Sequence, residues 1–143
     1  MIALDTNLLV YAHQHDSPWR EQAVAAIRPV IEGRVPWALP WPVIHEFFGV
    51  VTHTRFKVPS TPAEALGMLR SLLASPTVQV IGEGPGHFDV LADLITRARL
   101  YGPMVHDARI AAICMSHGVR ELWSVDRDFS RFPDLKVRNP LVI

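Results

Sequence analysis

The chain has 143 residues, of which 49% are hydrophobic and 20% charged, a composition typical of one globular domain. It excludes a disordered chain, and no stretch approaches the ~20 apolar residues that a membrane-spanning helix needs. Asp5 lies where a basic leader would begin, so we expect no secretory signal. The single cysteine, Cys114, excludes an intramolecular disulfide. We therefore expect one cytoplasmic domain over residues 1–143.

The formal charge is balanced, with 14 basic and 14 acidic side chains. This balance argues against a uniformly basic surface of the kind that binds nucleic acids. If five acids gather at one site, however, nine remain elsewhere against the 14 basic residues. A neutral total is therefore compatible with a basic rim around an acidic pocket.

Apolar runs and helix caps define the expected elements of the first half of the chain. A short apolar run that ends at Asp5 predicts a buried strand. Ser17 and Pro18 offer an N-cap with proline at the first helical position, and the segment from Thr61 to Glu64 matches a capping box. The expected elements are strands at 2–4 and 37–40, helices at 7–13, 18–31 and 62–73, and a helix from 42.

The second half continues the same alternation of strands and helices. Residues 78–81 alternate as a strand, Gly102 and Pro103 break the following helix, and Gly118 ends the next one. The expected elements are helices at 88–100 and 107–116 and strands at 78–81, 122–125 and 141–143. Strands separated by helices predict an α/β domain with a parallel sheet and helices on both faces.

Acidic side chains recur near the carboxyl ends of the predicted strands, the edge at which open parallel sheets bind ligands. Four separate segments deliver them to this edge. The acids are Asp5, Glu46, Asp107, Asp126 and Asp128. Their joint placement predicts a functional site.

Each acid also has a structural interpretation. Asp5 and Asp107 stand where an aspartate often caps a helix. Asp126 and Asp128 are compatible with ordinary loop acids. Glu46 has apolar neighbours, and a half-buried carboxylate at that position needs a partner.

Carboxylates that are brought together repel one another and raise one another's pKa, and a divalent cation relieves this repulsion. Oxygen ligands without thiolates or several histidines suit Mg²⁺ or Mn²⁺. Such an ion clamps a phosphodiester, lowers the pKa of the attacking water and stabilises the leaving oxygen. Thr6 and Asn7 add short polar groups that can orient a water or a carboxylate.

Four segments resemble, in the same order, the motifs of PIN-domain ribonucleases, and the chain is similar in length to VapC toxins. The segments are Asp5-Thr6-Asn7, residues 41–47 around Glu46, residues 105–112 around Asp107, and residues 124–129 with Asp126 and Asp128. The resemblance implies a PIN-like three-layer α/β fold whose central, mainly parallel sheet is flanked by helices.

The resemblance also implies a Mg²⁺- or Mn²⁺-dependent endoribonuclease, the toxin of a type II toxin–antitoxin pair, that leaves a 5′-phosphate and a 3′-hydroxyl. Its metal-binding and catalytic acids would be Asp5, Glu46, Asp107 and Asp126, with Asp128 open as the alternative to Asp126. Ser124 stands where the family often has threonine and keeps the hydroxyl. The implied partners are RNA, a small VapB-like antitoxin, and a second copy in a homodimer or a toxin–antitoxin hetero-oligomer.

Basic side chains near these motifs are candidates for contacts with RNA phosphates, although solvated charges need no function. They are Arg109, Arg127 and Arg131, and His106 beside Asp107 is a candidate for orienting a phosphate.

The alternative function is a non-catalytic interaction domain on the same fold, which an incomplete acid set would favour. A phosphoacceptor receiver needs an early acidic pair and a late lysine, and the chain has neither in place. The Asp126-Arg127-Asp128 run has the spacing of a phosphatase motif but lies at the wrong end of the chain. The glycine-rich run at 82–87 resembles a dinucleotide loop, but Pro85 removes an amide and His87 takes the final glycine position.

Overall fold

The computed structural model describes residues 1–142 and contains a five-stranded sheet, with all neighbouring strands parallel. The strand order is β3-β2-β1-β4-β5. The strands are β1 (Ile2–Leu4), β2 (Trp37–Pro40), β3 (Val78–Ile81), β4 (Glu121–Trp123) and β5 (Val137–Arg138). This confirms the predicted α/β fold with a parallel sheet.

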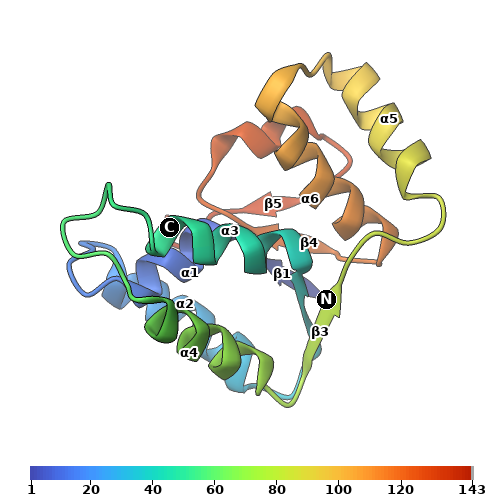
Figure 1. The fold of residues 1–143 in the computed structure, drawn as a ribbon. Coiled ribbons are helices and arrows are strands. Elements are labelled where there is room, and N and C mark those ends of the chain that lie inside the picture. Colours follow the sequence, from blue (N-terminus) through green and yellow to red (C-terminus); the bar gives the residue numbers. More distant parts are fainter. Residues whose placement is uncertain (143) are drawn as a thin grey trace.

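Six α-helices in the described part of the chain flank the sheet (Figure 1). They are α1 (Thr6–His13), α2 (Arg20–Glu32), α3 (Trp41–Val51), α4 (Pro62–Leu73), α5 (His87–Ala98) and α6 (Val105–Ser116). Two 3₁₀ turns, η1 (Gly102–Met104) and η2 (Arg127–Arg131), precede α6 and follow β4. Helix α1 packs against α2 and α3, α3 packs against α4, and α5 packs against α6. Figure 1 shows α5 and α6 at the upper right, apart from α1, α2 and α4.

The strand order creates a switch point between β1 and β4. From β1 the chain moves outward through β2 to β3, then crosses back to add β4 and β5 on the other side. Right-handed crossovers then place the first helices and the α5–α6 pair on opposite faces. The segments that follow β1 and β4 therefore turn to opposite faces of the sheet and leave a crevice between them. Ligands of open parallel sheets bind in such a crevice.

The core lies along the sheet and under α6. All four residues of β2 are buried, and the indole of Trp37 donates a hydrogen bond to Ser75 Oγ at 2.9 Å. Helix α6 buries Ala108 and every residue from 110 to 114. These buried residues follow the first turn of α6 and fix the position of the helix against the sheet.

The local signals for helix ends are largely confirmed. The capping box at the start of α4 is present, with Thr61 N donating to Glu64 Oε1 at 3.0 Å and Glu64 N donating to Thr61 Oγ1 at 3.2 Å. Gly118, which follows α6, adopts the left-handed conformation with φ of 68°. The predicted N-cap of α2 is wrong, because the helix begins at Arg20 and its N-cap is Trp19, so Ser17 and Pro18 both lie before it. Helix α6 begins at Val105 rather than residue 107.

The last predicted strand is wrong. Strand β5 is Val137–Arg138, whereas Leu141 and Val142 lie outside any strand and residue 143 lies outside the described residues. Strand β4 also ends at Trp123 instead of residue 125. Strand β5 pairs with the last two residues of β4. It contains no apolar run, so the sequence pattern did not indicate it.

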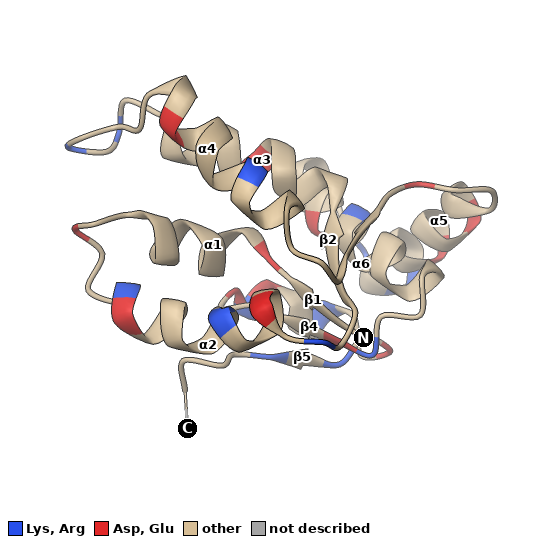
Figure 2. Ribbon diagram, turned by 90° about the horizontal axis from the view of Figure 1, so that it is seen from below, with Lys and Arg blue, Asp and Glu red and all other residues tan. Residues whose placement is uncertain are grey.

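Basic and acidic residues are interspersed over the helices and loops (Figure 2). Among residues 1–142, no helix is both long and apolar enough to cross a membrane.

Candidate active site

Asp5 leaves β1 at the switch point and is fixed to β4. Its backbone N–H donates to Trp123 O at 3.0 Å, and its carboxylate Oδ2 accepts a hydrogen bond from Ser124 Oγ at 2.6 Å. Asp5 occupies the N-cap position of α1, but its side chain makes no capping hydrogen bond. The capping interpretation of Asp5 is therefore wrong, and the carboxylate belongs to the switch point.

Burial dominates the electrostatics of Asp5, which is only 4% exposed. Desolvation raises the pKa of the Asp5 carboxyl to about 6, although the hydrogen bond from Ser124 opposes the shift. The carboxylates of Glu46 and Asp126 contribute smaller parts of the same upward shift. A buried acid with other acids nearby is costly to ionise unless a cation joins it.

Ser124 links Asp5 to the acids that follow β4. Its hydroxyl donates to Asp5 and accepts a hydrogen bond from Asp126 N at 3.0 Å. The Asp126 carboxylate in turn accepts a hydrogen bond from Asp128 N at 2.8 Å. Asp126 thereby caps the start of η2. This chain of hydrogen bonds sets the direction of the loop and carries Asp126 and Asp128 back toward the crevice.

Three carboxylates meet at the mouth of the crevice. Asp107, Asp126 and Asp128 each offer an oxygen, and these oxygens lie within 4.8 Å of one another. Asp107 lies inside the first turn of α6, so it is not the cap that one interpretation of the sequence made it. Burial and, to a smaller extent, the charges of the nearby aspartates raise the pKa of Asp107 to about 6, and Arg131 opposes this shift.

Glu46 lies on α3 at the rim of the site and is exposed, not half-buried as its apolar neighbours suggested. The surrounding protein still desolvates its carboxylate enough to raise the pKa, and Asp107 and Asp126 contribute in the same direction. His106, also exposed, opposes this shift. The carboxylate of Glu46 therefore lies near enough to Asp107 and Asp126 for their charges to interact.

The two polar residues after Asp5 face different surroundings. Thr6 is buried and approaches Glu46 closely enough to lower its pKa, but within residues 1–142 its hydroxyl has no partner in hydrogen-bond geometry. Asn7 instead lines a cavity beside α1. The unpartnered Thr6 hydroxyl leaves a polar group available to a water or ion at the site.

The three candidate arginines differ in their availability. Arg109 is ion-paired with Glu83, and Arg131 Nη2 lies 3.6 Å from Asp128 Oδ1. Arg127 is exposed and forms no ion pair with any residue in the described range. Arg127 is therefore the arginine best placed to meet an added anion.

The donor set suits a hard divalent cation. Carboxylate oxygens from two segments, α6 and the loop after β4, converge, and a buried hydroxyl is unpartnered. Among the described residues, Arg131 is the one arginine paired to this acid cluster. Oxygen ligands of this kind bind small divalent ions that retain waters. The arrangement can therefore hold a cation and present it to a phosphodiester.

Sequence reasoning missed a cavity of about 410 Å³ that begins at Asn7. Asn7 and Tyr11 line it from α1, and Gln14 lines it from the C-cap position of that helix. Their spacing of four and three residues places them on one helix face, which is the signal that the sequence offered.

The family model for the PIN domain matches residues 2–135 of this chain. Ribonuclease VapC48 of Mycobacterium tuberculosis is 31% identical over 137 residues, covering 95% of this chain and 94% of the relative. Ribonuclease VapC31 of the same species is 33% identical over 150 residues, covering 99% of this chain and 100% of the relative. The matched region contains all five acids of the candidate site.

Solved structures share the fold. The complex VapBC2 from Rickettsia felis, bound to a promoter DNA fragment, includes a chain with a TM-score of 0.70 and 20% identity, covering 96% of this chain and 98% of that one. VapC20 of Mycobacterium tuberculosis, described as a toxin that cleaves the sarcin–ricin loop, has a TM-score of 0.66 and 18% identity, with coverage of 91% and 93%. With its parallel sheet, its acidic switch point and these relatives, the chain belongs to the PIN-domain family.

Proposed function

We propose that this chain is a Mg²⁺- or Mn²⁺-dependent endoribonuclease, the toxin of a toxin–antitoxin pair. The observation that carries the proposal is the group of three carboxylates within 4.8 Å beside the buried Asp5. Relatives named VapC ribonucleases, 31–33% identical to this chain, support the same activity. The reaction would be hydrolysis of an RNA phosphodiester.

The proposed cation ligands are Asp5, Asp107 and Asp126, with Glu46 at the rim. Asp126 is preferred over Asp128 because Asp128 is more exposed and is already paired with Arg131. Asp128 then contributes negative charge and, through its backbone N–H, holds the Asp126 carboxylate in place.

A bound divalent cation would clamp the phosphodiester and lower the pKa of the attacking water. The protein's own groups would orient the reactants. Ser124 fixes the Asp5 carboxylate, and Glu46, whose pKa is raised, is suited to accept a proton from the water at its carboxylate. Arg127 is placed to contact an RNA phosphate.

The proposed bond changes account for the products. Water oxygen attacks phosphorus, and the bond from phosphorus to the 3′-oxygen breaks. The leaving oxygen takes a proton from solvent and becomes the 3′-hydroxyl, while the phosphate remains on the 5′-oxygen of the other fragment. Glu46 is the proposed acceptor of the water proton.

We also propose a VapB-like antitoxin as partner, with the toxin as a homodimer or in a hetero-oligomer, acting in the cytoplasm. Support comes from chains of similar fold that occur in toxin–antitoxin structures from Rickettsia felis and Klebsiella pneumoniae and in FitAcB from Neisseria gonorrhoeae. The alternative, a non-catalytic interaction domain, does not account for the complete set of acids at the switch point.

The test is cleavage of a labelled total RNA pool by purified protein with Mg²⁺, Mn²⁺ or EDTA. We expect discrete cuts that need the cation and disappear in Asp5→Asn, which keeps nearly the same volume. Cuts that persist in Asp5→Asn would assign the activity to another site or a contaminant. If neither cation binding nor RNA cleavage is measurable, the interaction domain becomes the better explanation.

A further inference from the structure

A cavity of about 410 Å³ runs beside α1, and one end of it is lined by Asn7 in the first turn of that helix, whose N-cap is Asp5. Its volume lies within the ~300–1,000 Å³ of typical small-ligand pockets. Asn7, which lines it, directly follows Thr6 of the acidic site. An RNA chain bound across the acids would therefore come close to the end of the cavity that Asn7 lines.

Aromatic side chains form much of the cavity wall. Tyr11 comes from α1, Trp19 precedes α2, and Phe56 follows α3. Trp19 is 47% exposed, and the Arg55 guanidinium carbon lies 5.5 Å from the centre of the Phe56 ring. Unpaired bases of RNA stack on aromatic rings and on arginine planes of this kind.

The polar groups of the wall are incompletely satisfied. Gln14 is 8% exposed, and within residues 1–142 its side-chain Nε2 has no hydrogen-bond partner. A buried donor without an acceptor destabilises the protein unless an occupant supplies one. Asp16 lines the same cavity and offers a carboxylate acceptor. An amide donor and a carboxylate acceptor in one cavity wall are the kinds of group that can hydrogen-bond to the polar edge of a nucleobase.

We propose that this cavity, the base pocket, holds one unpaired nucleobase of RNA next to the phosphate that is cut. The proposal rests on the proposed nuclease function and adds a determinant of sequence preference to it. Arg55 provides a positive charge for a phosphate beside the base, which favours RNA over an apolar protein segment as the occupant. The aromatic walls supply affinity, and Gln14 with Asp16 supplies discrimination between bases.

The test measures RNA binding in an Asp5→Asn background, so that the RNA stays intact. The probes are fluorescein-labelled single-stranded homopolymers of A, C, G or U, about 12 nucleotides long, and the readout is fluorescence anisotropy. Adding Trp19→Ala should weaken binding about tenfold, because one base loses its stacking partner. Trp41→Ala is the matched control, because Trp41 is 46% exposed and stacks on His45 outside the pocket.

A second variant tests discrimination. Gln14→Met keeps the length of the side chain and removes the amide, so the affinity ratio between the best and worst homopolymers should move toward one. Circular dichroism and melting curves establish that each variant is folded. Equal effects of Trp19→Ala and Trp41→Ala, or an unchanged ratio in Gln14→Met, would overturn the base pocket.

The outcomes separate this inference from the nuclease function. If the protein with Asp5 intact cuts RNA and Trp19→Ala changes neither binding nor the cut positions, the pocket is wrong and the nuclease stands. If it cuts no RNA but the homopolymers bind in a Trp19-dependent way, the pocket stands and the nuclease is wrong. Binding of a co-expressed antitoxin that depends on Trp19, with RNA binding unaffected, would assign the cavity to a protein partner and overturn the inference.

Discussion

Asp5 follows the carboxyl end of β1, and Glu121 begins the neighbouring strand β4. The two are almost equally buried, 4% and 7% exposed, yet their pKa values shift in opposite directions. For both carboxyls, burial opposes ionisation. At Glu121, hydrogen bonds from Trp123 Nε1 and Lys136 outweigh burial and lower the pKa. At Asp5, one serine hydroxyl is insufficient, and two further carboxylates add to the cost.

The comparison shows how a site acid differs from a structural acid in this molecule. Glu121 has its cation within the chain, since Lys136 Nζ lies 3.1 Å from Oε2. The acids at the carboxyl ends of β1 and β4 have little positive charge near them within the chain. A bound divalent cation would supply that charge.

The largest expected effect is on RNA cleavage by Asp5→Asn. Removing one cation-binding charge should lower cleavage by about 10³-fold or more, an effect of the size seen when a group acting in the transition state is lost. The matched control is Asp89→Asn, an exposed aspartate on α5, which should leave cleavage unchanged. Equal activities of the two variants would show that Asp5 is an ordinary buried acid.

The second effect is on thermal stability with and without a cation. A ligand that binds the folded state at 100 times its Kd adds about 2.7 kcal/mol. For a chain of this size we expect saturating Mg²⁺ to raise the Tm by roughly 5–10 °C over EDTA. Differential scanning calorimetry provides the measurement. A shift of the same size in Asp5→Asn would place the cation elsewhere.

The third effect is on the pH dependence of the Tm in EDTA, where substitutions of Asp5 and Glu121 should shift the Tm in opposite directions. Because the pKa of Asp5 is raised from 3.8 to about 6, its contribution to stability is present below the unfolded value and is lost as pH rises through 6. Asp5→Asn should therefore melt higher than the unsubstituted protein at pH 7.5, with a smaller gap at pH 4.5.

Glu121 should behave in the opposite way. Its lowered pKa gives a contribution that is present above the unfolded value and is lost as pH falls through the folded value. Glu121→Gln should therefore melt lower than the unsubstituted protein at pH 7.5, and the gap should close under acid conditions. If both variants shift the Tm in the same direction at pH 7.5, the proposed difference between Asp5 and Glu121 is wrong.

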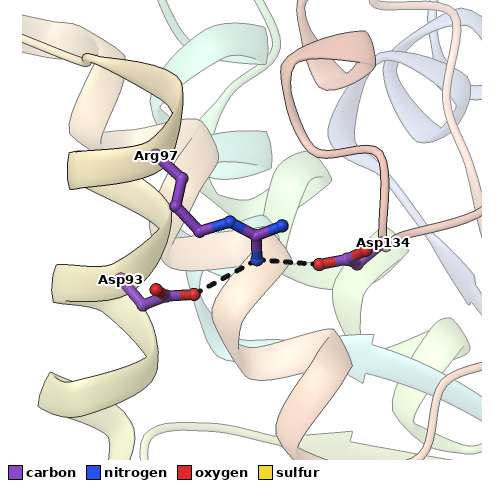
Figure 3. A network of polar contacts seen from close by, with 3 residues as sticks. All are labelled: Asp93, Arg97 and Asp134. Atoms are coloured by element: carbon purple, nitrogen blue, oxygen red, sulfur yellow. Dashed lines mark hydrogen bonds and ion pairs between the residues drawn. The ribbon is translucent and has the colours of Figure 1, made fainter.

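The smallest effect concerns the exposed network of Asp93, Arg97 and Asp134 (Figure 3). Arg97 joins α5 to the loop before β5 through contacts of 3.3 Å to Asp93 and 2.9 Å to Asp134. Exposed ion pairs contribute about 0–1 kcal/mol, so Arg97→Ala should lower the free energy of unfolding by at most about 1 kcal/mol. Urea unfolding measures this, and a larger loss would show that the network holds the loop in place.

Local sequence signals determined much of the fold. Proline positions, the capping box at Thr61 and the apolar runs predicted the strands β1 to β3 and the helices, because these features act within one turn or one strand. They also placed the acids after the strands. The strand β5 escaped prediction because two residues with charged neighbours form it only by pairing with β4.

The tertiary structure alone decided which groups meet. The hydrogen bond between Ser124 and Asp5 joins residues 119 positions apart, and it exists because β1 and β4 are neighbours in the sheet. The exposure of Glu46, the grouping of Asp128 with Asp107, and the unpartnered amide of Gln14 depend in the same way on packing between distant segments. Sequence periodicity reports which face of an element is apolar, whereas distances between side chains and their desolvation depend on how the elements pack together.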